Sequence, residues 1–155
     1  MYKTAVRAML RHSIKKLHRG DYSLLLKLAH PNFELAFPGD NTWSTMFRPQ
    51  VRGRDRHVTH RGVTEATAFA DRFVSEGIQF HVEDILVNGP PWKNRIAVRT
   101  HNYIPGSDGG PDRYANRAVL FLETRWGRLV RWEDYEDTER VAAWDATSGR
   151  DLPAR

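Results

Sequence analysis

The sequence predicts an α+β fold, and a change of pattern along the chain supports this prediction. In the first half, apolar residues recur every three or four positions, which places them on one face of a helix. From residue 78 onward the period drops to two, which is typical of strands, and turn segments such as "GPP" at 89–91 separate them. Helices followed by a run of strands favour a curved antiparallel sheet packed against N-terminal helices.

Three helices are expected before the change of period. The first covers residues 3–18, where apolar side chains form one stripe. Asp21 is a good N-cap for a short second helix over 22–30. The third helix fits residues 62–77. The stripe of the first helix consists of Val6, Met9, Leu10, Ser13, Ile14 and Leu17.

Five strands and a closing helical turn over 139–146 complete the expected elements. A long Arg-rich segment at 38–62, which contains Trp43, is expected to be irregular. Loops of more than about 15 residues in compact domains are usually functional lids or disordered. The expected strands cover residues 32–37, 78–88, 94–104, 113–126 and 128–138.

Length and composition indicate one compact domain. With 155 residues, of which 40% are hydrophobic, the chain fits a single domain over 1–147 followed by a flexible tail at 148–155. There is no apolar run of about 18 residues and no apolar stretch after the first Met. We therefore expect a cytoplasmic protein with no membrane partner. The absence of Cys excludes disulfides and thiolate metal ligands.

The net charge of +5 is concentrated in two basic segments. Residues 1–20 carry six Lys or Arg and no acid, and residues 48–61 carry five Arg against one Asp. Basic proteins often bind nucleic acid, but the chain shows no helix-turn-helix, zinc-finger or RNA-binding pattern. We therefore expect a solvated basic surface and no nucleic-acid partner. His57 and His60 lie among the Arg residues, where a lid that recognises an anion is an alternative and a metal site is not expected.

One carboxylate in the last strand is the main candidate for chemistry. Alternation in "RWEDYEDTER" places one set of side chains on the same side: Val130, Trp132, Asp134 and Glu136. This side begins apolar and aromatic and then presents a carboxylate. An apolar wall raises the pKa of a carboxyl group and makes it a general acid or base near neutrality, so Asp134 is the candidate. Glu133 and Asp137 point to the other side and are expected to pair with Arg residues at the surface.

The strand "AVRTHNY" offers partners for Asp134. Arg99, His101 and Tyr103 share one face of it. We expect Arg99 to pair with Asp134, and His101, which titrates near neutrality, to be a second proton carrier. The alternatives are a structural bridge between Asp134 and an Arg, and a hydrogen-bonded wall position for His101. The expected walls of the substrate pocket are Phe37, Trp43, Tyr103 and Trp132.

Several short motifs in a fixed order carry a resemblance to a known family. They are "GD" at 20–21, "FPG" at 37–39, "GPPW" at 89–92 and "WGRLVRWEDYED" at 126–137. Together they resemble the nuclear transport factor 2-like superfamily, specifically its SnoaL-like polyketide cyclase and limonene epoxide hydrolase branches. The likeness spans about residues 3–145. It implies a cone of curved sheet closed by helices, a deep apolar pocket and, commonly, a homodimer formed across the sheet.

The resemblance also implies roles for particular residues. In both branches the Asp of a W-x-D pattern is the acid–base residue, and Asp134 matches it. Arg99 matches the Arg of an Arg-x-Asp pattern in the epoxide hydrolase branch, whereas His101 replaces the second carboxylate. The water-holding Tyr and Asn of that branch fall near Glu34 and Ala36, which do not match. Ketosteroid isomerase chemistry is excluded, because its catalytic Asp and Tyr fall on Phe37 and Ser13.

These observations predict an enzyme that works by acid–base catalysis without a cofactor or metal. We expect a SnoaL-like cyclase, dehydratase or epoxide hydrolase that acts on a small hydrophobic molecule in a deep pocket. Asp134, Arg99 and His101 are its expected catalytic residues. The alternative is a non-catalytic small-molecule-binding or dimerisation domain of the same fold. The expected partners are a small hydrophobic substrate and a second copy of the chain.

Overall fold

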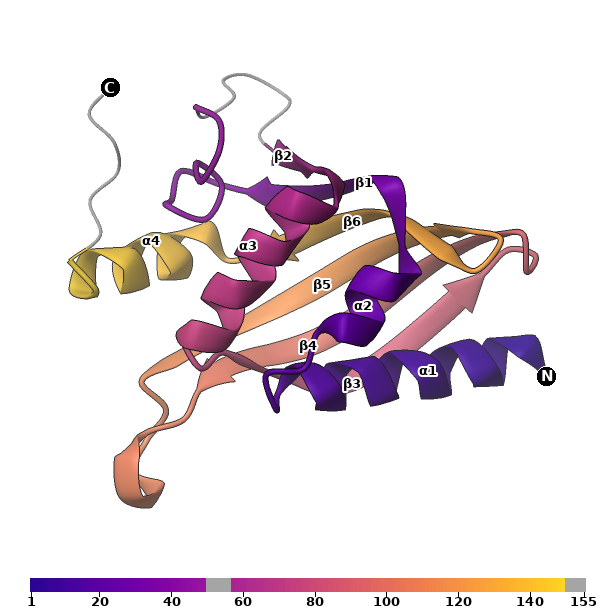
Figure 1. The fold of residues 1–155 in the computed structure, drawn as a ribbon. Coiled ribbons are helices and arrows are strands. Elements are labelled where there is room, and N and C mark those ends of the chain that lie inside the picture. Colours follow the sequence, from indigo (N-terminus) through magenta and orange to yellow (C-terminus); the bar gives the residue numbers. More distant parts are fainter. Residues whose placement is uncertain (50–56, 150–155) are drawn as a thin grey trace.

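All the predicted helices and strands are present in the expected order, with one additional strand at His57–Arg61 (Figure 1). The computed structural model describes residues 1–49 and 57–149. The helices are α1 (Tyr2–Leu17), α2 (Ser23–Leu28), α3 (Gly62–Ser75) and α4 (Thr138–Thr147), with a short 3-10 helix η1 at Ser107–Gly109. The strands are β1 (Ala29–Pro38), β2 (His57–Arg61), β3 (Gln79–Asn88), β4 (Lys93–Ile104), β5 (Tyr114–Arg125) and β6 (Arg128–Glu136). The predicted α+β class is confirmed.

The described strands form one curved, open sheet in the order β2-β1-β6-β5-β4-β3. Strands β3 to β6 form an antiparallel meander, as expected. Strand β1, however, runs parallel to β6, so the expectation of an antiparallel sheet was wrong at this pairing. Tight hairpins impose an antiparallel direction on successive strands. No hairpin connects β1 to β6, and local sequence patterns therefore do not determine how they pair.

Strand β2 was not predicted, because it lies in the Arg-rich segment that was expected to be irregular. It pairs antiparallel with β1, placing His60 opposite Leu35. The ring of His60 is buried, with Nε2 3.0 Å from the Trp43 carbonyl oxygen, and burial lowers its pKa. A neutral, buried His60 does not bind an anion at the surface. Arg52, Arg54 and Arg56 of the proposed lid lie outside the described residues.

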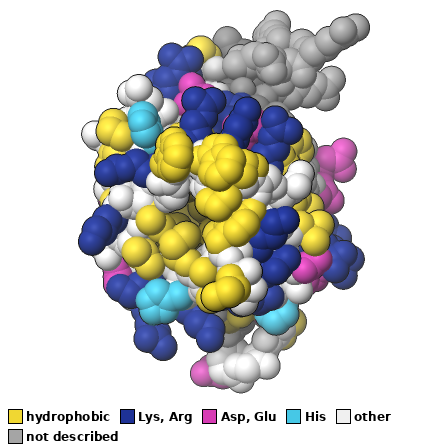
Figure 2. Space-filling model, turned by 90° about the vertical axis from the view of Figure 1, so that its right-hand side faces the viewer, with side chains coloured by type: hydrophobic (Ala, Val, Ile, Leu, Met, Phe, Trp, Pro, Cys, Tyr) yellow, Lys and Arg dark blue, Asp and Glu magenta, His cyan; other side chains and the backbone are white. Residues whose placement is uncertain are grey.

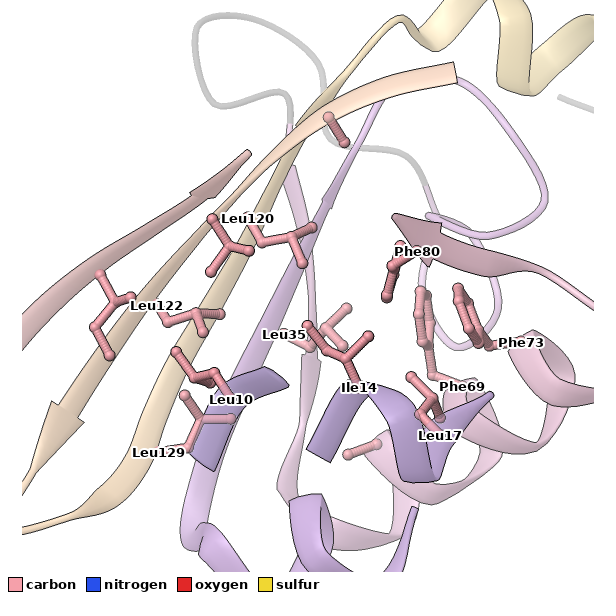
Figure 3. Close-up of a cluster of buried hydrophobic side chains, with 14 of the residues drawn as sticks. Leu10, Ile14, Leu17, Leu35, Phe69, Phe73, Phe80, Leu120, Leu122 and Leu129 are labelled. Atoms are coloured by element: carbon pink, nitrogen blue, oxygen red, sulfur yellow. The ribbon is translucent and has the colours of Figure 1, made fainter. Parts of the chain in front are cut away.

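The core lies between one face of the sheet and helices α1, α2 and α3 (Figure 1). Leu10, Ile14 and Leu17 of the predicted stripe on α1 are buried against it (Figure 3). Phe69 and Phe73 of α3 lie beside Phe80 at the other side of the same cluster (Figure 3). Each such side chain contributes about 1.5–3 kcal/mol by leaving water. Among the described residues, no helix combines the length and apolarity that crossing a bilayer requires.

Candidate functional site

A cavity lies between the inner face of the sheet and helices α2, α3 and α4. Its volume is about 100 Å³, far above the roughly 15 Å³ that a single water needs. Its wall is mostly apolar and rich in aromatic side chains, as is common for pockets that bind small organic molecules. The aromatic wall residues include Phe33, Phe37, Trp43, Phe69, Phe73, Phe80, Trp132 and Trp144. Phe37, Trp43 and Trp132, which were predicted as walls of a substrate pocket, line this cavity.

One end of the cavity is polar. Asp134 and Glu136 reach it from β6, Asn102 from β4 and Tyr114 from the start of β5. These strands are neighbours in the sheet, so their inward side chains form a contiguous group. Ala118 of β5 stands opposite Glu136 of β6, and its small side chain leaves room for the carboxyl groups.

Asp134 is buried at this polar end, with 6% of its surface exposed. The indole Nε1–H of Trp132 donates a hydrogen bond of 3.1 Å to its Oδ1. Residues two apart in a strand share a face, which gives the W-x-D spacing a physical reason: the Trp orients the carboxyl group. Burial raises the pKa of Asp134 to about 7, although the hydrogen bond from Trp132 acts in the opposite direction. This value suits a general acid or base near neutral pH.

Glu136 lies two residues further along the same face and also lines the cavity. The side-chain amide of Asn116 donates 3.2 Å to its Oε2. Burial raises the pKa of Glu136 well above its usual value, and the charge of Asp134 raises it further. Two like charges in one apolar cavity do not ionise independently, so the pair titrates as a unit. Near neutral pH the two carboxyl groups therefore retain a proton between them.

Two neutral donors stand beside the carboxyl pair. The Thr100 hydroxyl donates 2.7 Å to Oδ1 of Asn102, which leaves the amide nitrogen of Asn102 as a donor. The Tyr114 phenol accepts a hydrogen bond of 3.0 Å from Asn116. Burial and the charge of Glu136 raise the pKa of Tyr114, so the phenol keeps its hydrogen. None of the described residues that line the cavity is a Lys, Arg or His.

The expected pairing of Arg99 with Asp134 was wrong. Arg99 points away from the cavity, has a side chain that is 64% exposed, and pairs with Glu83 at 3.1 Å between Nε and Oε2. His101 and Tyr103 are on the same outer face, where their rings stack 5.9 Å apart. Neither of them lines the cavity, contrary to the prediction for both.

The apolar residues of β4 explain why this face turns outward. The side chains that turn inward are Ile96, Val98, Thr100, Asn102 and Ile104. Three of these five are aliphatic, whereas the other face carries Arg99 and His101, and an unpaired buried cation costs several kcal/mol. Burial of the aliphatic set therefore decides the orientation and brings Asn102, rather than His101, to the site. The alternation of aliphatic and polar residues along β4 therefore predicts this orientation from the sequence.

Within β6, alternation predicted the functional side chains but not the start of the strand. Trp132, Asp134 and Glu136 line the cavity, but Leu129 takes the inward place expected for Val130. The pairing of β6 with β5 shifts register at this point, which marks an irregularity that alternation cannot show.

The expected surface roles of the neighbouring acids are confirmed. Glu133 forms an ion pair with Arg131 on the opposite face of β6. Asp137 pairs with Arg140 at 3.4 Å and caps α4 by accepting hydrogen bonds from two backbone amides. The five acids of residues 131–140 therefore fall into two groups. Two line the cavity, Asp134 and Glu136, and three lie outside it, Glu133, Asp137 and Glu139.

A buried ionic network around Arg72 contacts Trp43 of the cavity wall. Arg72 of α3 donates 2.9 Å to the carbonyl oxygen of Thr42 and 2.8 Å to Oε1 of Glu76. It also lies 3.4 Å from Oδ1 of Asp145 in α4 and 3.9 Å from the ring centre of Trp43. Sequence reasoning missed this network because its members lie far apart in the chain.

No metal centre accompanies these sites in the part of the chain that the structure describes. Residues 1–49 and 57–149 contain no group of three or more His, Asp or Glu side chains arranged to hold a metal ion.

Comparisons with solved structures support the fold strongly, although sequence comparisons find nothing similar. No sequence-defined family matches the chain, and no curated protein is similar to it. An NTF2-like protein of unknown function from Burkholderia pseudomallei superposes with a TM-score of 0.63 at 20% identity, over 96% of this chain and 97% of its own. Bal32a, from a soil-derived mobile gene cassette, gives a TM-score of 0.64 at 17% identity, over 89% and 94% of the chains.

A third structure, TerC co-crystallised with polyporic acid, gives a TM-score of 0.62 at 17% identity, over 85% of this chain and 91% of its own. The curved sheet, the helices on one face and the internal pocket define an α+β protein of the cystatin-like class. Within this class, the chain has the nuclear transport factor 2-like fold, and the predicted resemblance is confirmed for the fold.

Proposed function

We propose that the cavity is the active site of an enzyme that transfers protons without a cofactor, on a small, hydrophobic, uncharged molecule. The observation that carries this proposal is the carboxyl pair of Asp134 and Glu136 at the polar end of an aromatic cavity. A pair that retains one proton offers a base and an acid within one site. The co-crystallisation of TerC with polyporic acid supports an organic ligand for this fold.

The surroundings favour a carbonyl compound as substrate. Asn102 and Tyr114 provide neutral donors at the same end of the cavity as the carboxylates. Such donors stabilise the negative charge that develops on a carbonyl oxygen when a neighbouring proton is removed. Asp134 would take that proton. Glu136 would give its proton to the departing hydroxyl, which leaves as water, or to the alkoxide oxygen that an aldol addition forms. Dehydration and aldol cyclisation both follow this course.

Epoxide opening is the less favoured reaction within the same class. In the epoxide hydrolase branch an Arg bridges two carboxylates, and here Arg99 is on the outer face of the sheet. A domain that serves only for dimerisation would have a pocket filled by side chains or an outward Asp134, whereas here Asp134 is buried and lines a cavity. The carboxyl pair in the cavity therefore favours an enzyme over a non-catalytic domain.

Turnover by carboxyl variants tests the proposal. Hydroxy-ketones, aldol substrates of the polyketide type and epoxides would be screened with the wild type, Asp134→Asn and Glu136→Gln. We expect Asp134→Asn to lower kcat by about 10²–10⁴-fold, which is the range for removing a general acid or base. Glu133→Gln and Arg99→Gln are matched controls on the outer face and should keep the wild-type rate. Equal rates for wild type and Asp134→Asn would remove Asp134 from the mechanism.

We also propose that the outer face of the sheet joins two copies of the chain, as the resemblance implies. Val119 of β5 stands between Arg99 of β4 and Tyr135 of β6 in one cross-strand row. Val119 and Tyr135 are exposed, and Arg99 forms an ion pair with Glu83 beside them. An apolar centre flanked by both signs of charge is complementary to itself under a two-fold rotation.

Sedimentation of one variant tests this interface. Val119→Glu places a charge at the centre of the row, where it would meet its own copy across the two-fold axis. We expect a dimer for the wild type and a monomer for the variant at the same concentration. Glu139, an exposed residue in the first turn of α4, provides the control Glu139→Gln, which should remain dimeric. A wild-type protein that sediments as a monomer would refute the proposed interface.

A further inference from the structure

Two exposed tryptophans lie together at one end of the sheet. Trp92 follows the turn between β3 and β4 and is 52% exposed, and Trp126 lies in the turn between β5 and β6 and is 81% exposed. Their ring centres are 6.2 Å apart, and the Trp126 amide donates 3.2 Å to the Trp92 carbonyl oxygen. These two side chains, called the tryptophan tip below, form one apolar projection from neighbouring hairpins.

The backbone at Trp126 is unfavourable for a bulky residue. Trp126 has a φ of 50° and Gly127 a φ of 74°, so both central residues of this two-residue loop are left-handed. Such loops favour Asn-Gly, whereas a large side chain at positive φ is disfavoured. Trp126 therefore carries backbone strain without burying its ring in the protein. A strained, exposed aromatic residue indicates contact with something outside the chain.

The surroundings of the tryptophan tip are basic. Lys93 stands directly opposite Arg125, and Arg125 opposite Arg128, although like charges in such positions destabilise a sheet. Residues 88–93 and 125–128 contain no Asp or Glu. The Tyr2 hydroxyl donates to the Gly89 carbonyl, which brings the basic N-terminal turn of α1 to the same end. Figure 2, which looks onto this end, shows hydrophobic side chains gathered together with Lys and Arg side chains around them.

We propose that the tryptophan tip docks on the surface of an anionic lipid bilayer. Trp side chains prefer the interface between headgroups and acyl chains, and Lys and Arg beside them are attracted to anionic lipids. A protruding apolar point flanked by Lys93, Arg125 and Arg128 matches this chemistry. The sequence predicted no membrane partner because it lacks an apolar span, but binding at a surface requires none.

Two other occupants fit the same geometry less well. The two indole rings are tilted by 35° to each other, so they do not form the parallel slot in which a base of single-stranded nucleic acid would stack. A second copy of the chain would bring Lys93, Arg125 and Arg128 against the same cations, and like charges across an interface are unfavourable.

Vesicle binding by a turn variant tests the role of Trp126. The wild type should sediment with vesicles of phosphatidylcholine mixed with phosphatidylserine, less so at high salt, and hardly with phosphatidylcholine alone. Trp126→Asn should lower the affinity for the mixed vesicles by about tenfold or more. Because Asn-Gly suits this loop, the variant should melt at the same or a higher temperature. Unchanged vesicle binding by Trp126→Asn would overturn the proposal.

A matched pair of charge variants separates local docking from attraction by net charge. Lys93→Gln with Arg128→Gln should lose about fivefold in affinity for each charge removed. Lys15→Gln with Arg19→Gln removes the same charge from exposed positions towards the other end of α1 and should bind as the wild type does. Equal losses for both double variants would contradict the proposal. Binding to single-stranded DNA without binding to vesicles, or loss of the dimer in Trp126→Asn, would also contradict it.

Discussion

Replacement of Asp134 by Asn is expected to stabilise the protein at pH 8 by about 4 kcal/mol, even though it removes the candidate base. The pKa of Asp134 is about 7 in the folded protein against 3.8 for the ordinary group, and each unit between two pKa values is worth about 1.4 kcal/mol. Below about pH 3.8 both states hold the proton, and the group has no effect on stability. Between pH 3.8 and 7 only the unfolded state loses it, so the wild type becomes less stable as pH rises.

Denaturation at several pH values measures this effect. The free energy of unfolding of the wild type should fall by about 3 kcal/mol more than that of Asp134→Asn between pH 5 and pH 8. Asn has no proton to lose, so the variant lacks this contribution. Glu133→Gln changes an acid on the opposite face, which is paired with Arg131, and should not acquire the same stabilisation at pH 8. Parallel pH profiles for the wild type and Asp134→Asn would contradict a raised pKa at this position.

The loss of stability caused by a buried Asp134 bears on function, because the fold does not require an acid at this position. Asn would keep the shape of Asp134 without the burden of a buried charge. The hydrogen bond from Trp132 orients the carboxyl group, and Glu136 beside it makes ionisation still harder. Sites of this kind, where stability is given up to hold a group in an unfavourable state, are typical of catalysis.

The sequence predicted the features of this site that depend on local periodicity. Alternation in β6 placed Trp132 and Asp134 on one side, and the cavity lies on that side. Alternation also groups Glu136 with them, but it gives no sign that Glu136 lines the cavity beside Asp134, and this role was not predicted. A charged residue is not recognised as buried until its neighbours in space are known. In the fold it is Ala118 on the next strand that leaves room for Glu136.

The orientation of β4 could have been predicted, whereas other features could not. Ile96, Val98 and Ile104 mark the buried face of this strand, and alternation from these residues predicts that Arg99 and His101 point outward. The parallel pairing of β1 with β6 and the network around Arg72 join segments that are distant in the chain. Local patterns carry no information about such contacts, which arise only when the elements pack.

Replacement of Arg72 by Met should destabilise the protein by about 3–5 kcal/mol, the range for breaking a buried ion pair on one side. The Arg72 side chain is mostly buried and lies beside the buried carboxyl groups of Glu76 and Asp145. It also donates to the backbone of Thr42 and covers the ring of Trp43. Without the guanidinium, two acids lose their nearby cation. The change in the free energy of unfolding by denaturant measures this loss.

Two further variants test whether the loss of stability comes from leaving Glu76 and Asp145 without their cation, rather than from removing any Arg. Arg140 forms an exposed pair with Asp137, so Arg140→Met should cost less than about 0.5 kcal/mol. Adding Asp145→Asn to Arg72→Met should recover part of the stability, because one of the uncompensated acids is then neutral. A double variant that loses the sum of both single effects would contradict the network. Because Trp43 forms part of the cavity wall, we expect Arg72→Met to weaken ligand binding as well, although Arg72 itself does not line the cavity.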